Sequence, residues 1–129
     1  MSVRLLVAED EVLNREVIEE MLLLEGLECD LVCNGLEAVN AVTNGQYALV
    51  LMDFRMPVMD GLEATTRIRA EEARRRSSGG PDGHIPIIAM TGSVLKEDRD
   101  RGLAAGMDDY LTKPLRIDHL AATVKKWIK

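Results

Sequence analysis

Apolar and polar residues along this chain form two kinds of segment. Short apolar runs bounded by polar or turn residues are typical of strands that are buried on both faces. Five such runs occur, over residues 3–8, 28–33, 47–52, 85–90 and 110–112. Longer segments with apolar residues at helical spacing follow them, over about 13–24, 34–44, 60–76, 95–105 and 117–128. The pattern therefore predicts a strand followed by a helix, five times over.

The ends of the predicted helices carry start and stop signals. Asn34, followed three residues later by Glu37, resembles a capping box, and Asp60 is placed to cap the third helix. Gly26 and Gly106 follow the first and fourth helices, and a glycine commonly ends a helix. These signals agree with the helix bounds that the apolar spacing predicts.

The first predicted helix has an apolar face and an acidic face. In the first helix, apolar residues at helical spacing predict the buried stripe, and glutamates predict the solvent side. The apolar set is Leu13, Val17, Met21 and Leu24, and the acidic set is Glu16, Glu19 and Glu20.

The third helix carries a basic cluster, which we interpret as a solvated helix end, with a docking patch for an acidic partner as the alternative. Its members are Arg67, Arg69, Arg74, Arg75 and Arg76.

The alternation of strands and helices predicts the fold class. It requires right-handed crossovers, which produce a parallel sheet with helices on both faces. We therefore expect an α/β protein: a single domain over residues 1–129, with a doubly wound five-stranded parallel sheet and five helices. The simplest strand order is 2-1-3-4-5, an order already known for sheets of this class. We expect no second domain, and hence no output domain.

Composition narrows the functional classes. The chain is 47% hydrophobic but only 3% aromatic, which predicts an aliphatic core. Its formal charge of −6 argues against a general nucleic-acid binder. Since it has neither an apolar run of roughly 20 residues nor a secretory leader, we expect a soluble, cytoplasmic protein with no membrane partner. Cys29 and Cys33 are interpreted as small buried thiols rather than metal ligands or a disulfide.

Residues whose side chains could bind a ligand or react gather at the carboxyl ends of the predicted strands. Glu9 and Asp10 end the first strand and Asp53 ends the third. Thr91 ends the fourth strand and Lys113 follows the fifth. In an open α/β sheet, ligands bind at this edge. We expect Asp53 to stand at the tip of a rigid strand, exposed to solvent, with the other four groups around it.

Three acids at one edge need a counter-charge. Two carboxylates about 4 Å apart repel by roughly 4 kcal/mol at an effective dielectric constant near 20. Hard oxygen ligands with room for water suit Mg²⁺, and Lys113 is a second cation within reach. An aspartate beside Mg²⁺ and a lysine is also suited to act as a nucleophile that forms an aspartyl-phosphate. These residues therefore predict phosphoryl transfer to Asp53.

The chain resembles the receiver domains of response regulators in two-component and phosphorelay systems over essentially its whole length. The resemblance rests on Glu9-Asp10 and on residues 52–61, 90–92 and 106–114. It extends to chemotaxis regulators, and the loop over residues 56–61 is similar to that of hybrid-kinase receivers. The resemblance implies a flavodoxin-like fold. It also implies a signalling domain rather than an enzyme, with self-catalysed phosphoryl transfer to and hydrolysis from its own aspartate only.

The resemblance implies roles for the site residues. Asp53 would accept a phosphoryl group from a sensor histidine kinase or a histidine phosphotransfer protein, and Lys113 would pair with the phosphoryl oxygens. Thr91 would move to hydrogen-bond the phosphoryl group, and Tyr110 would rotate inward behind it. The surface of the fourth helix, fifth strand and fifth helix would then change shape and bind a downstream protein. Direct binding of nucleic acid is not expected.

The metal site is also implied by the resemblance. Asp10, Asp53 and the backbone carbonyl of Arg55 would bind Mg²⁺, and Glu9 would help through a water molecule. A cis peptide bond between Lys113 and Pro114 is expected, which would aim the lysine at the site.

The rim of the site is where the sequence is most individual. Arg55 and Ser93, together with Gly92, would flank the entrance to the site. Because Arg55 is large and cationic, we hypothesise that it partly covers the phosphoryl group and lengthens its lifetime. The segment 77–83 is rich in Gly, Ser and Pro and predicts a loop, in which we expect mobility.

Two questions stay open at this point. A haloacid-dehalogenase-type phosphatase also uses an aspartate at a strand end, but it places a second aspartate two residues later, where this chain has Arg55. A flavin-binding module of the same topology would need a Ser/Thr-rich phosphate loop after the first strand, where this chain has three acidic residues, Glu9, Asp10 and Glu11. Whether the receiver stands alone or belongs to a hybrid kinase or larger regulator is not decided by these residues.

Overall fold

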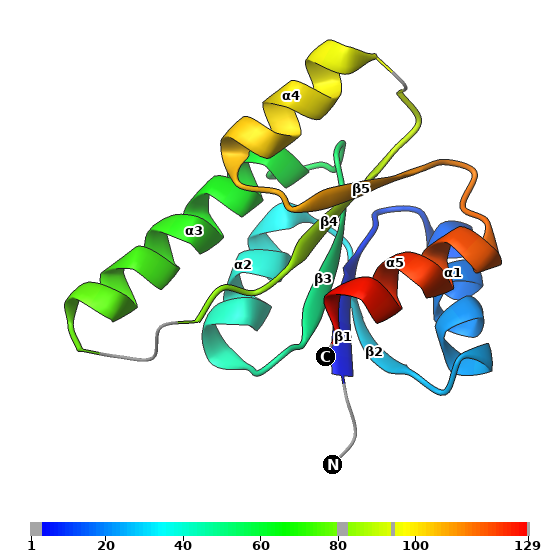
Figure 1. Ribbon diagram of the computed structural model, residues 1–129, viewed down its shortest axis with the longest axis horizontal. Helices are drawn as coiled ribbons and strands as arrows, with labels where there is room; N and C mark the ends of the chain where they lie inside the picture. The colour runs from blue at the N-terminus through cyan, green and yellow to red at the C-terminus, as the bar shows by residue number, and fades with distance from the viewer. Residues whose placement is uncertain (1–3, 80–82, 94, 129) are drawn as a thin grey trace.

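The computed structural model describes residues 4–79, 83–93 and 95–128, and within them it confirms the predicted succession of elements (Figure 1). The strands are β1 (Arg4–Ala8), β2 (Glu28–Val32), β3 (Leu49–Asp53), β4 (Ile87–Thr91) and β5 (Asp109–Thr112). The helices are α1 (Val12–Leu24), α2 (Gly35–Asn44), α3 (Gly61–Ser77), α4 (Lys96–Ala105) and α5 (Ile117–Trp127). Each element lies close to its predicted range.

The five strands are parallel and follow the predicted order β2-β1-β3-β4-β5. In Figure 1, α1 and α5 cover one face of the sheet, and α2, α3 and α4 lie on the other side. Two aliphatic clusters correspond to these layers. One includes Leu22 of α1 and Leu120 of α5, and the other includes Ala38 of α2 and Ile68 of α3. The sheet is therefore buried on both faces, as a doubly wound fold requires.

The central strand β3 is buried along its whole length. Leu49 and Leu51 belong to the cluster beneath α1 and α5, whereas Val50 and Met52 belong to the cluster on the other face. Both faces need apolar side chains, which explains the continuous apolar run in the sequence. Paired strands on both sides hold this backbone in place, so Asp53, its last residue, is carried by a rigid support.

The predicted caps are confirmed, except that Glu37 of the predicted capping box accepts from the N–H of Cys33 rather than from that of Asn34. Oδ1 of Asn34 accepts a hydrogen bond from the N–H of Glu37 at 2.8 Å, and Oδ1 of Asp60 accepts one from the N–H of Glu63 at 2.8 Å. Gly106 ends α4 with a φ of 113°, in the left-handed region where a side chain would be strained. Local side-chain chemistry therefore sets these helix ends.

The predicted buried stripe of α1 is wrong for three of its four residues, and only Met21 packs partly buried against the core. Ile18 and Leu22 face the core and are 3% and 1% exposed, whereas Leu13, Val17 and Leu24 are 74%, 50% and 71% exposed. Helix α1 carries apolar residues around more of its circumference than one stripe needs, so spacing alone cannot select the inward face. Packing against β1, β2 and α5 selects Ile18 and Leu22 and leaves an apolar strip in contact with solvent.

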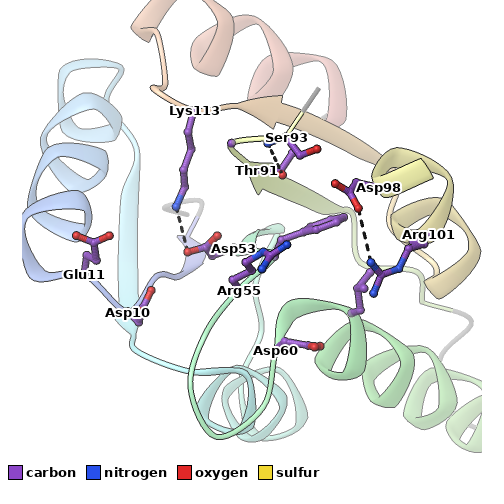
Figure 2. Close-up of a pocket in the computed structure, with 13 residues that line it drawn as sticks. Asp10, Glu11, Asp53, Arg55, Asp60, Thr91, Ser93, Asp98, Arg101 and Lys113 are labelled. Carbon is purple, nitrogen blue, oxygen red and sulfur yellow. Dashed lines mark hydrogen bonds and ion pairs between the residues drawn. The ribbon is translucent and has the colours of Figure 1, made fainter. Parts of the chain in front are cut away.

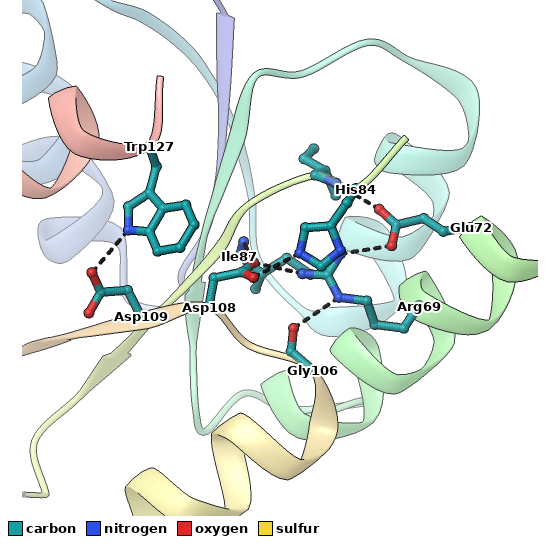
Figure 3. Close-up of polar contacts among 9 residues, drawn as sticks. Arg69, Glu72, His84, Ile87, Gly106, Asp108, Asp109 and Trp127 are labelled. Carbon is teal, nitrogen blue, oxygen red and sulfur yellow. Dashed lines mark hydrogen bonds and ion pairs between the residues drawn. The ribbon is translucent and has the colours of Figure 1, made fainter. Parts of the chain in front are cut away.

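The solvated interpretation of the basic cluster is wrong for Arg69, whose side chain is only 17% exposed. Its guanidinium donates to the carboxylates of Glu72 and Asp108, each at 2.8 Å (Figure 3). Asp108 also accepts a hydrogen bond from the N–H of Ile87 and pairs with the ring of His84, at 2.8 Å and 2.7 Å. This network joins α3 to the start of β4 and to the turn that leads into β5.

Both cysteines are free, but they are half-buried rather than fully buried, and Cys33 lies beyond the end of β2. Burial raises the pKa of the Cys29 thiol to about 11, so this group stays protonated and unreactive at neutral pH.

The predicted loop over residues 77–83 begins later than expected, because Ser77 is the last residue of α3. The expectation of mobility falls mainly on residues 80–82, which lie outside the described residues.

Candidate functional site

A pocket of about 630 Å³ opens at the carboxyl edge of the sheet (Figure 2). It is lined by Asp10, Glu11, Asp53, Phe54, Arg55, Asp60, Leu62, Thr91, Gly92, Ser93, Asp98, Arg101 and Lys113. The pocket thus gathers most of the residues that the sequence singled out. Glu9 and Tyr110 are not among its lining residues. Glu9 is fully buried, and Tyr110 lines a separate small cavity together with Thr91.

Three carboxyl groups meet at one point of this pocket. Oxygen atoms of Glu9, Asp10 and Asp53 all lie within 4.8 Å of one another. Glu9 is fully buried, and Asp10 is the most exposed of the three. Carboxylate oxygens are the donors that Mg²⁺ and Ca²⁺ prefer, so this set fits a hard divalent cation.

Asp53 is not exposed at a strand tip, as the sequence suggested, but is only 5% exposed. The loop after β3 folds back over it, and the N–H of Gly61 donates to the carbonyl of Phe54 at 3.0 Å. At Gly61 a Cβ atom would stand 2.1 Å from the backbone oxygen of Asp53, so only glycine permits this approach. The carboxylate of Asp53 is thus largely buried and lines the pocket.

Lys113 connects the ends of three strands. Its ammonium donates to Oε1 of Glu9 at 2.8 Å. It also donates to Oδ2 of Asp53 at 3.0 Å (Figure 2). The N–H of Lys113 donates to the carbonyl of Thr91 at 2.7 Å, and the expected cis bond to Pro114 is present. The lysine is thus held by its backbone on β4 and by its side chain at the acids of β1 and β3.

Arg15 has a role at this site that the sequence analysis did not detect. Its guanidinium donates to the carbonyls of Glu9 and Asp10 at 2.8 Å and 3.0 Å. These bonds fix the turn between β1 and α1 and so hold the two acids in place. An arginine in the first turns of a helix is common, and no spacing rule would have marked this one.

The pKa values of these groups show how burial and charge compete. Burial raises the pKa of Asp53 from 3.8 to about 6, with help from the charge of Glu9 and against the effect of Lys113. Burial also opposes ionisation of Glu9, but its hydrogen bonds from Lys113 and from the N–H of Glu11 prevail and lower its pKa. Burial opposes the charge on Lys113 as well, yet its two carboxylate partners raise its pKa. Burial thus favours the protonated form of Asp53, whereas the contacts with Lys113 favour its ionised form.

The predicted rim and switch residues have distinct positions. Arg55, Gly92 and Ser93 line the pocket, as expected for residues that flank its entrance. Thr91 is 5% exposed, and its Oγ1 accepts a hydrogen bond from the N–H of Ser93 at 3.0 Å. Tyr110 is 38% exposed, and its hydroxyl accepts a hydrogen bond from Arg99 of α4.

Comparison with known proteins identifies the kind of domain that carries this site. Residues 5–125 match the family described as the response regulator receiver domain. The chain belongs to this family. The receiver domain is 42% identical over 124 residues to the sensor protein GacS of Pseudomonas syringae pv. syringae, in a match that covers 96% of this chain and 13% of that protein.

Two solved structures resemble this receiver domain closely. One is the receiver domain of the sensor histidine kinase PA1611 of Pseudomonas aeruginosa PAO1, which holds a magnesium ion coordinated in its active-site cleft. It is 40% identical to this chain, with a TM-score of 0.84 and coverage of 98% of both chains. The receiver domain of the response regulator Ssk1 of Saccharomyces cerevisiae, in a co-crystal with the histidine phosphotransfer protein Ypd1, is 32% identical. Its TM-score is 0.90, with coverage of 98% of this chain and 88% of that chain.

These similarities confirm the predicted receiver family and its flavodoxin-like sheet, and they do not support the phosphatase alternative. The receiver domain spans 4% to 16% of the length of its curated relatives, so the activities of those whole proteins are not assigned to it. No helix in the described part of the chain combines the length and the apolar character needed to cross a bilayer.

The raised pKa of Asp53 predicts how stability depends on pH. The folded state holds the proton of Asp53 more tightly than the unfolded chain does. Protonation of Asp53 therefore adds to the free energy of unfolding, fully below about pH 4, and this contribution is lost as the pH rises through about 6. We expect metal-free Asp53→Asn to be more stable than the wild type at pH 7.5, by about 2 kcal/mol. Urea unfolding in a chelator, from pH 4 to 8, measures this difference.

The matched control for this prediction is Asp100→Asn on the exposed side of α4, where the carboxylate is 57% exposed. Its pH profile should follow that of the wild type. Parallel profiles for the wild type and Asp53→Asn would contradict the prediction.

Proposed function

We propose that this receiver domain accepts a phosphoryl group on Asp53 from the phosphohistidine of a sensor histidine kinase or a histidine phosphotransfer protein. The observation that carries the proposal is the junction of Asp53, Glu9 and Lys113 at the bottom of an open pocket. A buried carboxylate on a rigid strand, beside an ammonium and two further acids, suits nucleophilic attack on phosphorus better than general acid–base catalysis.

The transfer step needs few protein groups. One Oδ of Asp53 attacks the phosphorus atom, the P–N bond to the donor imidazole breaks, and its electron pair returns to that nitrogen. An acyl phosphate results. Lys113, 3.0 Å from Oδ2 of Asp53 before the reaction, is placed to bind a phosphoryl oxygen, and Thr91 is placed to donate a hydrogen bond to another. Positioning and charge neutralisation supply the catalysis, and only the domain's own aspartate is modified.

The acidic residues would hold Mg²⁺ during transfer. Asp10, Asp53 and the backbone carbonyl of Arg55 are the proposed ligands, with Glu9 acting through a water molecule. Support comes from the oxygen-only donor set and from the magnesium-bound receiver domain of PA1611. When bound, the cation neutralises charge on the phosphoryl oxygens and on the acids that surround them.

We further propose that phosphorylation is read out on the surface of α4, β5 and α5. Thr91 would turn toward the phosphoryl group, and Tyr110 would move inward into the space behind it. The changed surface would bind a downstream protein rather than nucleic acid or a membrane, in the cytoplasm.

The exposed strip of α1 is the proposed docking surface for the phosphohistidine donor. Leu13 lies in the first turn of α1, and Val17, one turn further along, lines a groove of about 390 Å³ that also includes Glu9, Lys113 and Pro114. Apolar side chains beside the reactive residue favour a protein donor over a small molecule. The co-crystal of the related Ssk1 receiver with Ypd1 supports a histidine phosphotransfer protein as the occupant.

The central proposal predicts which variants accept phosphate. With acetyl phosphate and Mg²⁺, the wild type should gain one phosphoryl group, whereas Asp53→Asn should gain none, because an amide is a poor nucleophile. Chelation of Mg²⁺ should abolish labelling of the wild type. Intact mass spectrometry measures each outcome. Asp60→Asn is the control: Asp60 lines the same pocket, but its side chain caps α3, a role that asparagine retains. Equal labelling of Asp53→Asn would overturn the proposal.

If the exposed strip of α1 is the docking surface, a substitution there should slow phosphoryl transfer from a protein donor but not from acetyl phosphate. Leu13→Ser should slow transfer from a phosphorylated histidine phosphotransfer protein by at least about fivefold, because an apolar contact worth about 1 kcal/mol is lost. Labelling by acetyl phosphate should stay the same. Leu23→Ser is the matched control, since Leu23 is also exposed, at 58%, but lies at the opposite end of α1. Equal slowing by both variants would argue against a docking role for the Leu13 end.

The position of Arg55 predicts the lifetime of the acyl phosphate. If its side chain shields the phosphoryl group from water, Arg55→Ala should lose phosphate several-fold faster than the wild type. Release of phosphate from purified phosphorylated protein measures the rate. Arg67→Ala, which removes an exposed arginine paired with Glu63 on α3, should have no effect. An unchanged or slower rate in Arg55→Ala would contradict the hypothesis.

A further inference from the structure

Arg99 of α4 makes two contacts with Tyr110 of β5, two neighbouring elements of the proposed output surface (Figure 1). Its Nη1 atom donates a hydrogen bond to the phenol oxygen of Tyr110 at 2.5 Å. Its guanidinium carbon also lies 5.0 Å from the centroid of the Tyr110 ring, within the range of a cation–π interaction. One side chain therefore engages both the hydroxyl and the face of the tyrosine.

A small cavity lies between Tyr110 and the phosphoacceptor site. Its lining includes Thr91, Phe54, Gly102, Met107 and Tyr110. The cavity measures about 10 Å³, roughly the space of a single water molecule and far less than a phenol ring. The tyrosine cannot enter until the lining moves. Thr91 and Phe54 line both this cavity and the pocket of Asp53, and Arg99 also lines the small cavity.

Helix α4 is weakly anchored to the rest of the domain. Gly102 is its only buried residue among those described, and its remaining side chains are half-buried or exposed. The contact of Arg99 with Tyr110 of β5 therefore adds to a small set of interactions that hold this helix in place.

We propose that Arg99 is a positioning residue that latches Tyr110 at the surface and so sets how readily this receiver reaches its phosphorylated conformation. The inference rests on the proposed function, because it assumes that Tyr110 moves when Asp53 is modified. An inward movement of Tyr110 must break both contacts with Arg99. If a phosphoryl group or its mimic at Asp53 favours the inward position of Tyr110, then contacts that favour the outward position must weaken binding of that group.

The composition of the chain allows a direct test. Tyr47 and Tyr110 are the only tyrosines, so protein labelled with 3-fluorotyrosine gives two ¹⁹F signals. Tyr47 hydrogen-bonds to Asp30 and serves as an internal reference. The mimic is beryllium trifluoride with Mg²⁺, titrated into the wild type, Arg99→Ala and Arg99→Lys. Lys96→Ala is the matched control, because Lys96 is an exposed cation of the same helix that pairs with Asp100.

We expect Arg99→Ala to bind the mimic three- to tenfold more tightly than the wild type and to shift the Tyr110 signal before any mimic is added. Arg99→Lys keeps the charge but loses the planar fork, and should fall between the two. Lys96→Ala should match the wild type. An unchanged or weakened affinity in both Arg99 variants, with an unmoved Tyr110 signal, would overturn the latch. Arg99→Lys alone decides the question if Arg99→Ala does not fold.

A double-mutant cycle separates the hydrogen bond from other effects. Tyr110→Phe removes the hydroxyl that accepts from Arg99, so in that background Arg99→Ala should change the affinity for the mimic less than it does in the wild type. Equal effects in both backgrounds would assign the change to something other than this hydrogen bond. Labelling of the wild type by acetyl phosphate is tested in parallel. A labelled wild type with no effect of Arg99 rejects only the latch, whereas an unlabelled wild type rejects the proposed function itself.

Discussion

The ammonium of Lys113 is the interaction on which the site depends. It binds the carboxylates of Glu9 and Asp53, which are both withdrawn from water. Without it, two buried acids would face each other with no counter-charge from the protein, at a high cost in stability. The contact also ties the end of β5 to the ends of β1 and β3, across the point where the strand order reverses. One ammonium does not balance three acids, and burial, with a smaller effect from the charge of Glu9, raises the pKa of Asp53 despite Lys113. The excess of acids over the single ammonium suits a site that works with a divalent cation and an anionic substrate.

The domain separates a rigid part from a part that is easily displaced. Strand β3 is buried throughout, and the loop after it is pinned where Gly61 approaches the backbone of Asp53. On the other side of Thr91, α4 buries only Gly102 among its described residues and meets β5 through polar and cation–π contacts. Such contacts can be exchanged at a modest cost, whereas an aliphatic core cannot be repacked cheaply. This division suits a domain in which the acceptor stays in place while a neighbouring surface responds.

Much of this arrangement could be predicted from the sequence, because strand order and strand ends follow from local patterns. Asp10, Asp53, Thr91 and Lys113 were placed at one edge by counting strands, and the structure brings them to one pocket. The errors share one physical cause, which is burial imposed by remote segments. Arg69 looks like a solvated arginine of a charged helix until Asp108, far along the chain, is placed beside it.

By itself, the sequence determined the succession of strands and helices, the helix caps at Asn34 and Asp60, and the set of acids at the strand ends. These depend on neighbours within a few residues along the chain. Only the tertiary structure decided which face of α1 is buried, that Asp53 is enclosed, and that Arg15 and Arg99 contact the acidic turn and Tyr110. The exposure and partners of a side chain depend on what the rest of the chain packs against it, and a local pattern does not contain that information.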